Sequence, residues 1–248
     1  MSEAVSAEPE VLIDKRDGLG RIVLNRPRAI NALNHAMVRR IAAALAEWSG
    51  DDAVRAVLIT GAGERGLCAG GDIVSIYHDA KDGGTGSREF WREEYILNAA
   101  IANYGKARLS AGDAIACGFA DHFVPSEKID GFVQALSETT VEAALAAFTA
   151  PAPVSELLAQ RGWIDAAYSA GSVAEIVSRL RSSGVAEAEK AAEQVVSKSP
   201  TACAVTLKSL RRARQADSLE EVLNDEFRVS VACLSSPDLV EGIRAQVV

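Results

Sequence analysis

Hydrophobic positions near the start of the chain follow the spacing of two short strands. Residues 11–14 and 21–24 are β-type runs, and the Asp17-Gly18-Leu19-Gly20 segment between them predicts a hairpin. Asn34 suits a helix N-cap, because apolar residues then recur every three or four positions as far as Ser49. The opening of the chain therefore predicts a β-β-α unit.

The next run, residues 53–60, is apolar almost throughout. Such a run is typical of a strand buried on both faces of a parallel sheet, so the fold class expected is α/β. Beyond it, the spacing predicts a helix starting at 72–78, a flexible exposed turn at 81–87 and an amphipathic helix at 88–104.

After Ser110 the spacing is almost entirely helical, with one further strand expected at 119–124. The predicted helices are 110–117, 126–136, 141–148, 155–160, 172–181, 185–197, 200–215, 218–234 and 237–246. We therefore expect an N-terminal α/β region, 1–104, followed by a mainly helical region, 105–248. Four or five strands make a thin sheet, because a buried parallel strand needs neighbours on both edges.

Composition and charge narrow the class of protein. Of the 248 residues, 48% are apolar and 24% are charged, which is a foldable globular composition. The formal net charge of −8 and the lack of a broad basic face argue against a nucleic-acid partner. The basic run 208–214 is either a solvated helix face or a contact for an anionic ligand.

No apolar stretch is long enough to cross a membrane, and the acidic start lacks the features of a secretory signal. We therefore expect no membrane partner and a cytoplasmic protein. The four cysteines and three histidines are scattered, so free thiols and no metal site are predicted.

The stretch 60–73 contains most of the candidate chemistry. Its glycines follow a predicted buried strand, where they let the backbone approach a ligand and turn N–H groups outward. The stretch matches neither a P-loop nor a dinucleotide-binding fingerprint. It is therefore either a ligand-binding loop or an ordinary tight turn. Cys68 lies within it, and small-residue packing is a better explanation for this thiol than nucleophilic chemistry.

Two motifs resemble the crotonase (enoyl-CoA hydratase/isomerase) superfamily. Cys68-Ala-Gly-Gly-Asp-Ile73 is similar to its oxyanion-hole segment, and Leu24-Asn-Arg-Pro-Arg-Ala-Ile-Asn-Ala-Leu33 to its first CoA-binding segment. The helix Phe90-Trp-Arg-Glu-Glu-Tyr-Ile-Leu-Asn98 is similar to the 3-hydroxyisobutyryl-CoA hydrolase branch. The resemblance implies a crotonase-like spiral of ββα units with a helical C-terminal region.

The resemblance also assigns roles to individual residues. Gly71 would donate its N–H to the thioester oxygen, and Glu94 would lie near the acyl group. The remaining implied contacts are with the CoA arm, by Ala69, Gly70, Asp72 and Ile73, and with the CoA nucleotide, by Arg28, Ala29 and Ile30. Without the resemblance, Glu94 would be read as a solvated helix carboxylate.

The expected activity is hydrolysis of the thioester 3-hydroxyisobutyryl-CoA in valine breakdown. No metal or redox cofactor is implied, because CoA enters as part of the substrate. The alternatives are an enoyl-CoA hydratase or isomerase, and an acyl-CoA-binding module without catalysis. Crotonase-like proteins often associate through C-terminal helices, so a homo-oligomer is a further expectation.

The chain departs from the family after Tyr104. The resemblance implies a segment here with a strand, a Gly-Gly-Gly turn bearing the second oxyanion donor, a Met-Pro-Glu motif and a Pro-Asp motif. The chain instead continues directly to Gly105-Lys106-Ala107-Arg108, and it contains neither Met-Pro-Glu nor Gly-Gly-Gly. It also ends earlier than expected. We therefore expect an internal deletion or omission that removes strands and both acid/base groups.

Overall fold

A computed structural model describes residues 8–103 and 111–247, and its contacts divide the chain into two units. The first unit comprises 8–103 and 122–151, and the second comprises 111–121 and 152–247. The sequence placed the boundary at residue 104, whereas the contacts group 122–151 with the N-terminal part. The junction expected to lack a segment, after Tyr104, lies outside the described residues.

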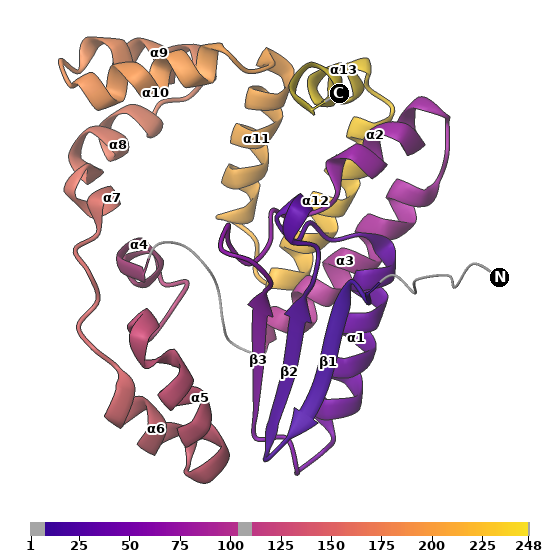
Figure 1. Cartoon of the computed structure of the whole chain (residues 1–248). Coiled ribbons are helices and arrows are strands. Elements are labelled where there is room, and N and C mark those ends of the chain that lie inside the picture. The colour runs from indigo at the N-terminus through magenta and orange to yellow at the C-terminus, as the bar shows by residue number, and fades with distance from the viewer. Residues whose placement is uncertain (1–7, 104–110, 248) are drawn as a thin grey trace. The chain divides into compact units, whose positions relative to one another are not determined.

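Three strands form the sheet of the first unit, in the order β1-β2-β3 (Figure 1). Strands β1 (Val11–Arg16) and β2 (Leu19–Leu24) form the predicted antiparallel hairpin. Strand β3 (Ala56–Gly61) pairs parallel to β2. The register aligns Ile13, Ile22 and Ile59 across the three strands, which places these side chains on one face of the sheet.

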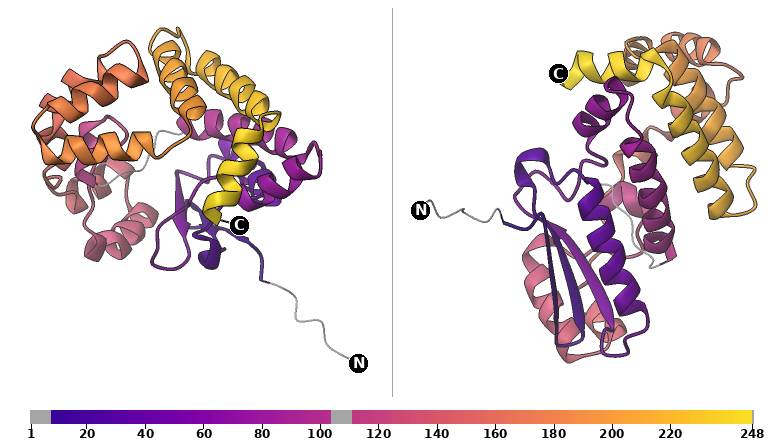
Figure 2. Two further views of the ribbon diagram at one scale, coloured as in Figure 1. Left: turned by 90° about the horizontal axis from the view of Figure 1, so that it is seen from above. Right: turned by 90° about the vertical axis from the view of Figure 1, so that its right-hand side faces the viewer.

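Helix α1 (His35–Ser49) covers that face, and Figure 2 (right) shows it alongside the strands. The predicted N-cap is confirmed, since Asn34 Oδ1 accepts a hydrogen bond from the Met37 N–H at 3.0 Å. The helix buries Met37, Val38, Ile41, Ala44, Leu45 and Trp48. The Trp48 ring fills the space beside Gly20, where an added Cβ would lie 2.6 Å from it. The helix and the hairpin thus share one apolar core.

Two later helices pack with the strands of this unit, α5 (Ile129–Glu138) and α6 (Val141–Phe148), after a 3₁₀ turn at Ser126–Lys128. Leu136 and Ala144 are buried in one cluster with Leu19 of β2. Arg55 Nη2 also donates to the carbonyl oxygens of Leu136 at 3.1 Å and Ser137 at 2.8 Å. These contacts explain why 122–151 belongs to the first unit.

Strand β3 lies at an edge of this described sheet. All six of its residues are half-buried, so the expectation of a strand fully buried on both faces is wrong. The strand expected at 119–124 is also wrong, because in this part of the structure Phe123 forms only a single bridge with Ala150. Phe119 is 52% exposed, so its side chain does not contribute to a core.

The first unit also contains a 3₁₀ turn at Pro27–Ala29 and two helices, α2 (Ile73–Lys81) and α3 (Gly86–Asn103). The turn between these helices is shorter and more ordered than expected. Asp79 accepts the N–H groups of Gly86, at 3.1 Å, and Ser87, at 2.7 Å. Ser87 is consequently buried rather than exposed, and helix α3 begins earlier than the sequence indicated.

The described part of the second unit is helical. Its helices are α4 (Ala111–Ala116), α7 (Glu156–Ala159), α8 (Arg161–Tyr168), α9 (Val173–Ser182), α10 (Ala186–Val196), α11 (Pro200–Ala213), α12 (Leu219–Leu234) and α13 (Pro237–Val247). Small residues of α8 and α10 bury Ile176 and Leu180 of α9 in a compact core. Helix α8 was not predicted. Among the described residues, no helix has the length and apolarity needed to span a membrane.

Candidate functional site

Two loops of the first unit run side by side and form the centre of the candidate site. The Ala69 N–H donates to Ile30 O at 2.9 Å, and the Leu33 N–H donates to Gly70 O at 2.8 Å. The Asp72 N–H donates to Leu33 O at 2.9 Å, which completes a short parallel ladder. The structure therefore brings together the two segments that the sequence motifs identified.

Gly71 lies between the hydrogen-bonded positions of this ladder. In a parallel pair, a residue so placed directs its own N–H and C=O away from the partner segment. The Gly71 N–H has no acceptor among the described residues. An added Cβ would lie 3.0 Å from Phe90 Cε1, so the aromatic ring closes one side of this glycine. Gly71 thus presents a fixed, available N–H donor.

A buried asparagine ties the glycine-rich loop to the other segment. Asn31 is fully buried, and its Nδ2 donates to Ala62 O at 3.0 Å and Gly66 O at 3.2 Å. Its Oδ1 accepts the Arg26 N–H at 2.9 Å. Asn31 has a φ of +55°, a left-handed conformation that asparagine adopts more readily than most residues. Gly61 permits this approach, because an added Cβ would lie 2.6 Å from Asn31 Nδ2.

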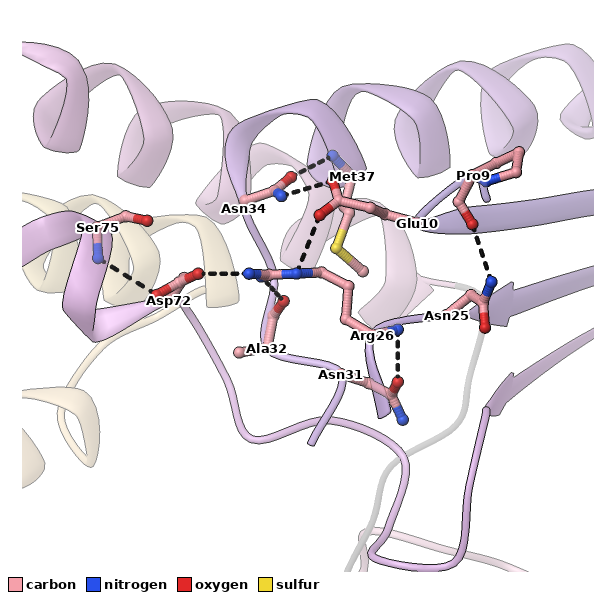
Figure 3. A network of polar contacts seen from close by, with 10 residues as sticks. All are labelled: Pro9, Glu10, Asn25, Arg26, Asn31, Ala32, Asn34, Met37, Asp72 and Ser75. Atoms are coloured by element: carbon pink, nitrogen blue, oxygen red, sulfur yellow. Dashed lines mark hydrogen bonds and ion pairs between the residues drawn. The ribbon is translucent and has the colours of Figure 1, made fainter. Parts of the chain in front are cut away.

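The side chain of Arg26 is the hub of the polar network in Figure 3. It donates through Nη2 to Asp72 Oδ2 at 2.9 Å and through Nη1 to Ala32 O at 2.7 Å. Its Nε lies 3.1 Å from Glu10 Oε1, and Glu10 also accepts a hydrogen bond from Asn34. The network therefore joins the start of β1, both loops and the first turn of α1.

Asp72 is used within this network rather than left free for a ligand. Its Oδ1 accepts the Ser75 N–H at 3.2 Å and caps α2, while Oδ2 binds Arg26. Partial burial tends to raise the pKa of Asp72, but the hydrogen bonds from Arg26 and Ser75 outweigh it and lower the pKa. The Asp72 carboxylate therefore supports the loop, and its predicted contact with the CoA arm stays a prediction.

The other predicted contact residues lie along the outer side of the two loops. Ala69, Gly70 and Ile73 are exposed, as are Arg28 and Ala29, while Ile30 is half-buried. Arg65 Nη2 fixes the 3₁₀ turn by donating to Pro27 O at 3.0 Å and Arg28 O at 2.6 Å. These backbone positions are therefore both held in place and open to a ligand.

Cys68 contributes to the shape of the loop. Its Sγ accepts the Gly70 N–H at 3.3 Å, immediately before Gly71. The backbone N–H of Gly70 is therefore occupied, whereas that of Gly71 meets no acceptor within 8–103 and 111–247. This contact gives Cys68 a structural position, in agreement with the interpretation of the thiol as a packing residue.

Glu94 lies one helical turn beyond Phe90 on α3, so the two side chains share a face of the helix. Its side chain is half-buried and forms no hydrogen bond or ion pair with a described residue. Burial raises the pKa of this carboxyl above its ordinary value. Glu94 is therefore a desolvated acid on the face of α3 that also carries the ring against Gly71, and not the solvated carboxylate of the alternative reading.

A cavity of about 360 Å³ lies next to Phe90, among the starts of helices α1, α2 and α3. It is lined by Leu33, Asn34, His35, Ala36, Asp72, Ser75, Ile76, Asp79, Gly86, Ser87 and Phe90. Within the described residues, no group of three or more acidic, histidine or cysteine side chains is arranged to hold a metal ion.

Sequence reasoning did not identify Arg26, Asn31 or Phe90 as functional supports. Arg26 and Asn31 lie inside the motif that resembles a CoA-binding segment. Asparagine adopts a left-handed backbone more readily than most residues, so its presence at position 31 was the available signal. No local signal marks Phe90, because its role depends on contact with a glycine 19 positions earlier in the chain.

The sequence matches the family model described as enoyl-CoA hydratase/isomerase over residues 19–109 and 106–248. The chain belongs to the enoyl-CoA hydratase/isomerase family. Two similar curated relatives are mitochondrial 3-hydroxyisobutyryl-CoA hydrolases. The Danio rerio protein is 32% identical, with 96% of this chain and 82% of the relative covered. The Xenopus tropicalis protein is 30% identical, with 99% and 83% covered.

Solved structures confirm the crotonase fold expected for an enoyl-CoA hydratase/isomerase family member. A carnitinyl-CoA dehydratase from Mycobacterium thermoresistibile is 42% identical, with a TM-score of 0.91 over 97% of this chain and 90% of that chain. An enoyl-CoA hydratase from Rhodobacter sphaeroides is 30% identical, with a TM-score of 0.86 over 96% and 89%.

This enoyl-CoA hydratase/isomerase family member is shorter than the stretch of its curated relatives to which it aligns. The alignment with the Danio rerio hydrolase spans 316 positions, which is more than the 248 residues of this chain. Some aligned positions of that relative therefore have no counterpart here. The two matches to the family model meet at residues 106–109, close to the junction where the sequence departs from the expected motif order.

Proposed function

We propose that the two loops of the first unit bind a CoA thioester, with the Gly71 N–H donating to the thioester oxygen. The observation that carries this proposal is the Gly71 N–H, which has no acceptor in the described structure and lies between two hydrogen-bonded neighbours. Because the ladder already fixes both neighbours, the donor needs little reorganisation when negative charge develops on the oxygen. Pre-aimed donors of this kind contribute roughly 3–4 kcal/mol to transition-state stabilisation.

The reaction we propose is hydrolysis of a short branched 3-hydroxyacyl-CoA, specifically 3-hydroxyisobutyryl-CoA, in valine breakdown. Water adds to the thioester carbonyl, and the tetrahedral intermediate then expels the CoA thiolate and leaves the free acid. The names of the curated relatives support this substrate. Glu94 would contact the acyl group from its half-buried position on α3, one turn beyond Phe90.

The CoA arm would lie along Ala69, Gly70, the backbone of Asp72, and Ile73, and the nucleotide end would lie near Arg28, Ala29 and Ile30. Two observations support this assignment. Ala69, Gly70 and Ile73 are exposed, and Arg65 holds the 3₁₀ turn at Pro27–Ala29 in place. CoA enters as part of the substrate, so no resident cofactor is proposed.

A second candidate function is hydration or dehydration of an acyl-CoA. It is favoured by the 42% identity to a structure named carnitinyl-CoA dehydratase, which exceeds the identity to the two hydrolases. Both reactions place negative charge on the thioester oxygen, so both would use the Gly71 N–H in the same way.

A third candidate is acyl-CoA binding without turnover. It is favoured by the aligned positions of the relatives that have no counterpart in this chain. In the family pattern, the expected acid and base motifs fall after the helix that holds Glu94, and this chain contains no Met-Pro-Glu motif. A chain with one oxyanion donor and no general base would bind a thioester but hydrolyse it slowly or not at all.

Binding and turnover are tested separately on the purified 248-residue chain. Calorimetry with 3-hydroxyisobutyryl-CoA measures affinity, thiol release measures hydrolysis, and crotonyl-CoA hydration measures the second candidate. Thiol release supports the hydrolase, and a dominant hydration rate replaces it with a hydratase. Tight binding with no turnover supports the third candidate. A lack of saturable binding by any acyl-CoA would overturn the site itself.

A further inference from the structure

The second unit contains a cavity of about 380 Å³ between the start of α9 and residues 204–212 of α11. It is lined by Gly171, Ser172, Val173, Ala204, Leu207, Lys208, Arg211, Arg212 and Gln215. Three of these side chains are basic and none is acidic. Leu207 also packs against the core formed by α8, α9 and α10, which anchors the turn of α11 that carries the basic groups. We call this feature the α9–α11 cavity.

Arg211 is held in place by neutral groups. Its guanidinium donates to Gly171 O at 2.8 Å and also to Ala170 O. Carbonyl oxygens fix the position of the guanidinium without cancelling its charge. The hydrogen bond from Arg179 is the main cause that lowers the pKa of Glu175, and the positive charge of Arg211 adds a smaller contribution. Glu175 is itself bound by Arg179 at 2.5 Å and by the Gly171 N–H at 3.1 Å.

The positive charges of Arg212 and Lys208 are also not fully neutralised by ion pairs with described residues. Arg212 pairs with Asp225 at 2.5 Å, but Asp225 pairs with Arg228 as well, so one carboxylate serves two guanidinium groups. Lys208 is exposed and forms no ion pair or hydrogen bond with any described residue. Three arginines near the cavity, Arg179, Arg212 and Arg228, share the carboxylates of Glu175 and Asp225. Lys208 and Arg211 form no ion pair with a described residue.

The start of α9 adds donors to the same wall. Ser172 caps this ten-residue helix by accepting the Glu175 N–H at 3.2 Å. Its hydroxyl hydrogen donates to no described residue. The first N–H groups of a helix have no acceptor within the helix. The positive end of the helix dipole therefore faces the same space as the basic side chains of α11.

We propose that the α9–α11 cavity binds the phosphate group of a phosphorylated small molecule. Arginine and lysine together with a helix start are the groups that recognise a phosphate dianion, and a cavity of this size accommodates one with part of its carrier. Under this proposal, the basic run 208–214 is an anion contact rather than a solvated helix face. The proposal does not depend on the thioester chemistry assigned to Gly71.

The test uses inorganic phosphate as the probe on the full ¹⁵N-labelled chain at constant ionic strength. We expect saturable shifts of the Ser172, Val173 and Lys208 amide signals, and none when chloride replaces phosphate. Lys208→Glu should weaken the affinity for phosphate about tenfold or more, since a charge-assisted contact becomes a repulsion. Lys190→Glu on α10 makes the same charge change at an exposed position outside the cavity and should alter affinity less than about twofold.

Shifts that do not saturate, or equal weakening by both variants, would overturn the proposal. The carrier is identified in a second arm that compares CoA with dephospho-CoA, which lacks the 3′-phosphate. If only CoA shifts the Ser172 and Val173 amides, the cavity holds the phosphate of CoA itself. If inorganic phosphate binds and both forms of CoA fail to shift these signals, the cavity serves a different phosphorylated ligand.

Discussion

Glu93 and Glu94 are neighbours on α3, yet their carboxyl groups have opposite surroundings. Glu93 accepts two hydrogen bonds from Arg39, at 2.7 and 2.8 Å. His35 Nε2 lies 2.9 Å from Glu93 Oε2, although this nitrogen makes no hydrogen bond of good geometry. Arg39 first and His35 second lower the pKa of Glu93 to about 2. Burial raises the pKa of Glu94 instead, and no described residue pairs with its carboxyl.

Replacing Glu94 with glutamine should increase stability at neutral pH. The wild-type protein must ionise a half-buried carboxyl as pH rises above the ordinary pKa of 4.5 and through the raised pKa of Glu94, which costs folding free energy. The free energy of unfolding of Glu94→Gln, relative to wild type, should therefore grow over that range. Urea unfolding at a series of pH values measures it. Glu193→Gln, at an exposed site, should show no such trend.

Replacing Glu93 with glutamine should have the opposite pH dependence. The ion pairs of Glu93 are complete above pH 4.5 and are lost as pH falls toward about 2. Because the pair is largely solvated, Glu93→Gln should cost only about 0.5–1 kcal/mol at neutral pH. The difference from wild type should disappear in acid. A constant difference across the pH series would contradict the assigned role of Arg39 and His35.

Gly71→Ala tests the close packing beside the proposed donor. The new Cβ would lie 3.0 Å from Phe90 Cε1 and 3.2 Å from Cζ, so the ring or the loop must move. We expect a loss of about 1–2 kcal/mol in the free energy of unfolding. Acyl-CoA affinity should fall as the N–H shifts. The double variant with Phe90→Leu should recover part of the stability, and simple additivity would argue against the contact.

Asn31→Ala should be among the most destabilising changes in the first unit. It removes hydrogen bonds to Ala62 O, Gly66 O and the Arg26 N–H and leaves these groups unsatisfied. We expect a cost of about 2–4 kcal/mol by urea unfolding. Asn31→Gly loses the same bonds but accepts the φ of +55°, so it should be about 1 kcal/mol less damaging. Asn98→Ala, on the exposed side of α3, provides the matched control.

Local pattern was sufficient for the hairpin, α1 and the cap at Asn34, because neighbours in sequence determine each of them. It failed for the strand at 119–124 and for α8. The first makes only the Phe123–Ala150 bridge in the described structure, and the second is a short helix separated from α7 by a single residue. In both places, contacts made after the chain folds decide the outcome.

The candidate site shows the same division. The motifs marked the segments 24–33 and 68–73, and the structure joins them by the ladder through Ile30, Leu33 and Gly70. They did not indicate that the Asp72 carboxylate binds Arg26, because this ion pair joins residues 46 positions apart. The grouping of 122–151 with the first unit also depends on distant contacts, since Arg55 reaches Leu136 and Ser137.

The two units are interleaved along the chain, and this affects the synthesis, the proteolysis and the dissection of the protein into fragments. From 8 to 247 the chain passes from the first unit to the second, back to the first and again to the second. Neither unit is therefore a contiguous fragment that can be excised, exchanged by recombination or expressed alone. During synthesis, the α/β unit stays incomplete until α6 has left the ribosome. A protease that cuts once between 111 and 121 leaves each resulting fragment with part of both units.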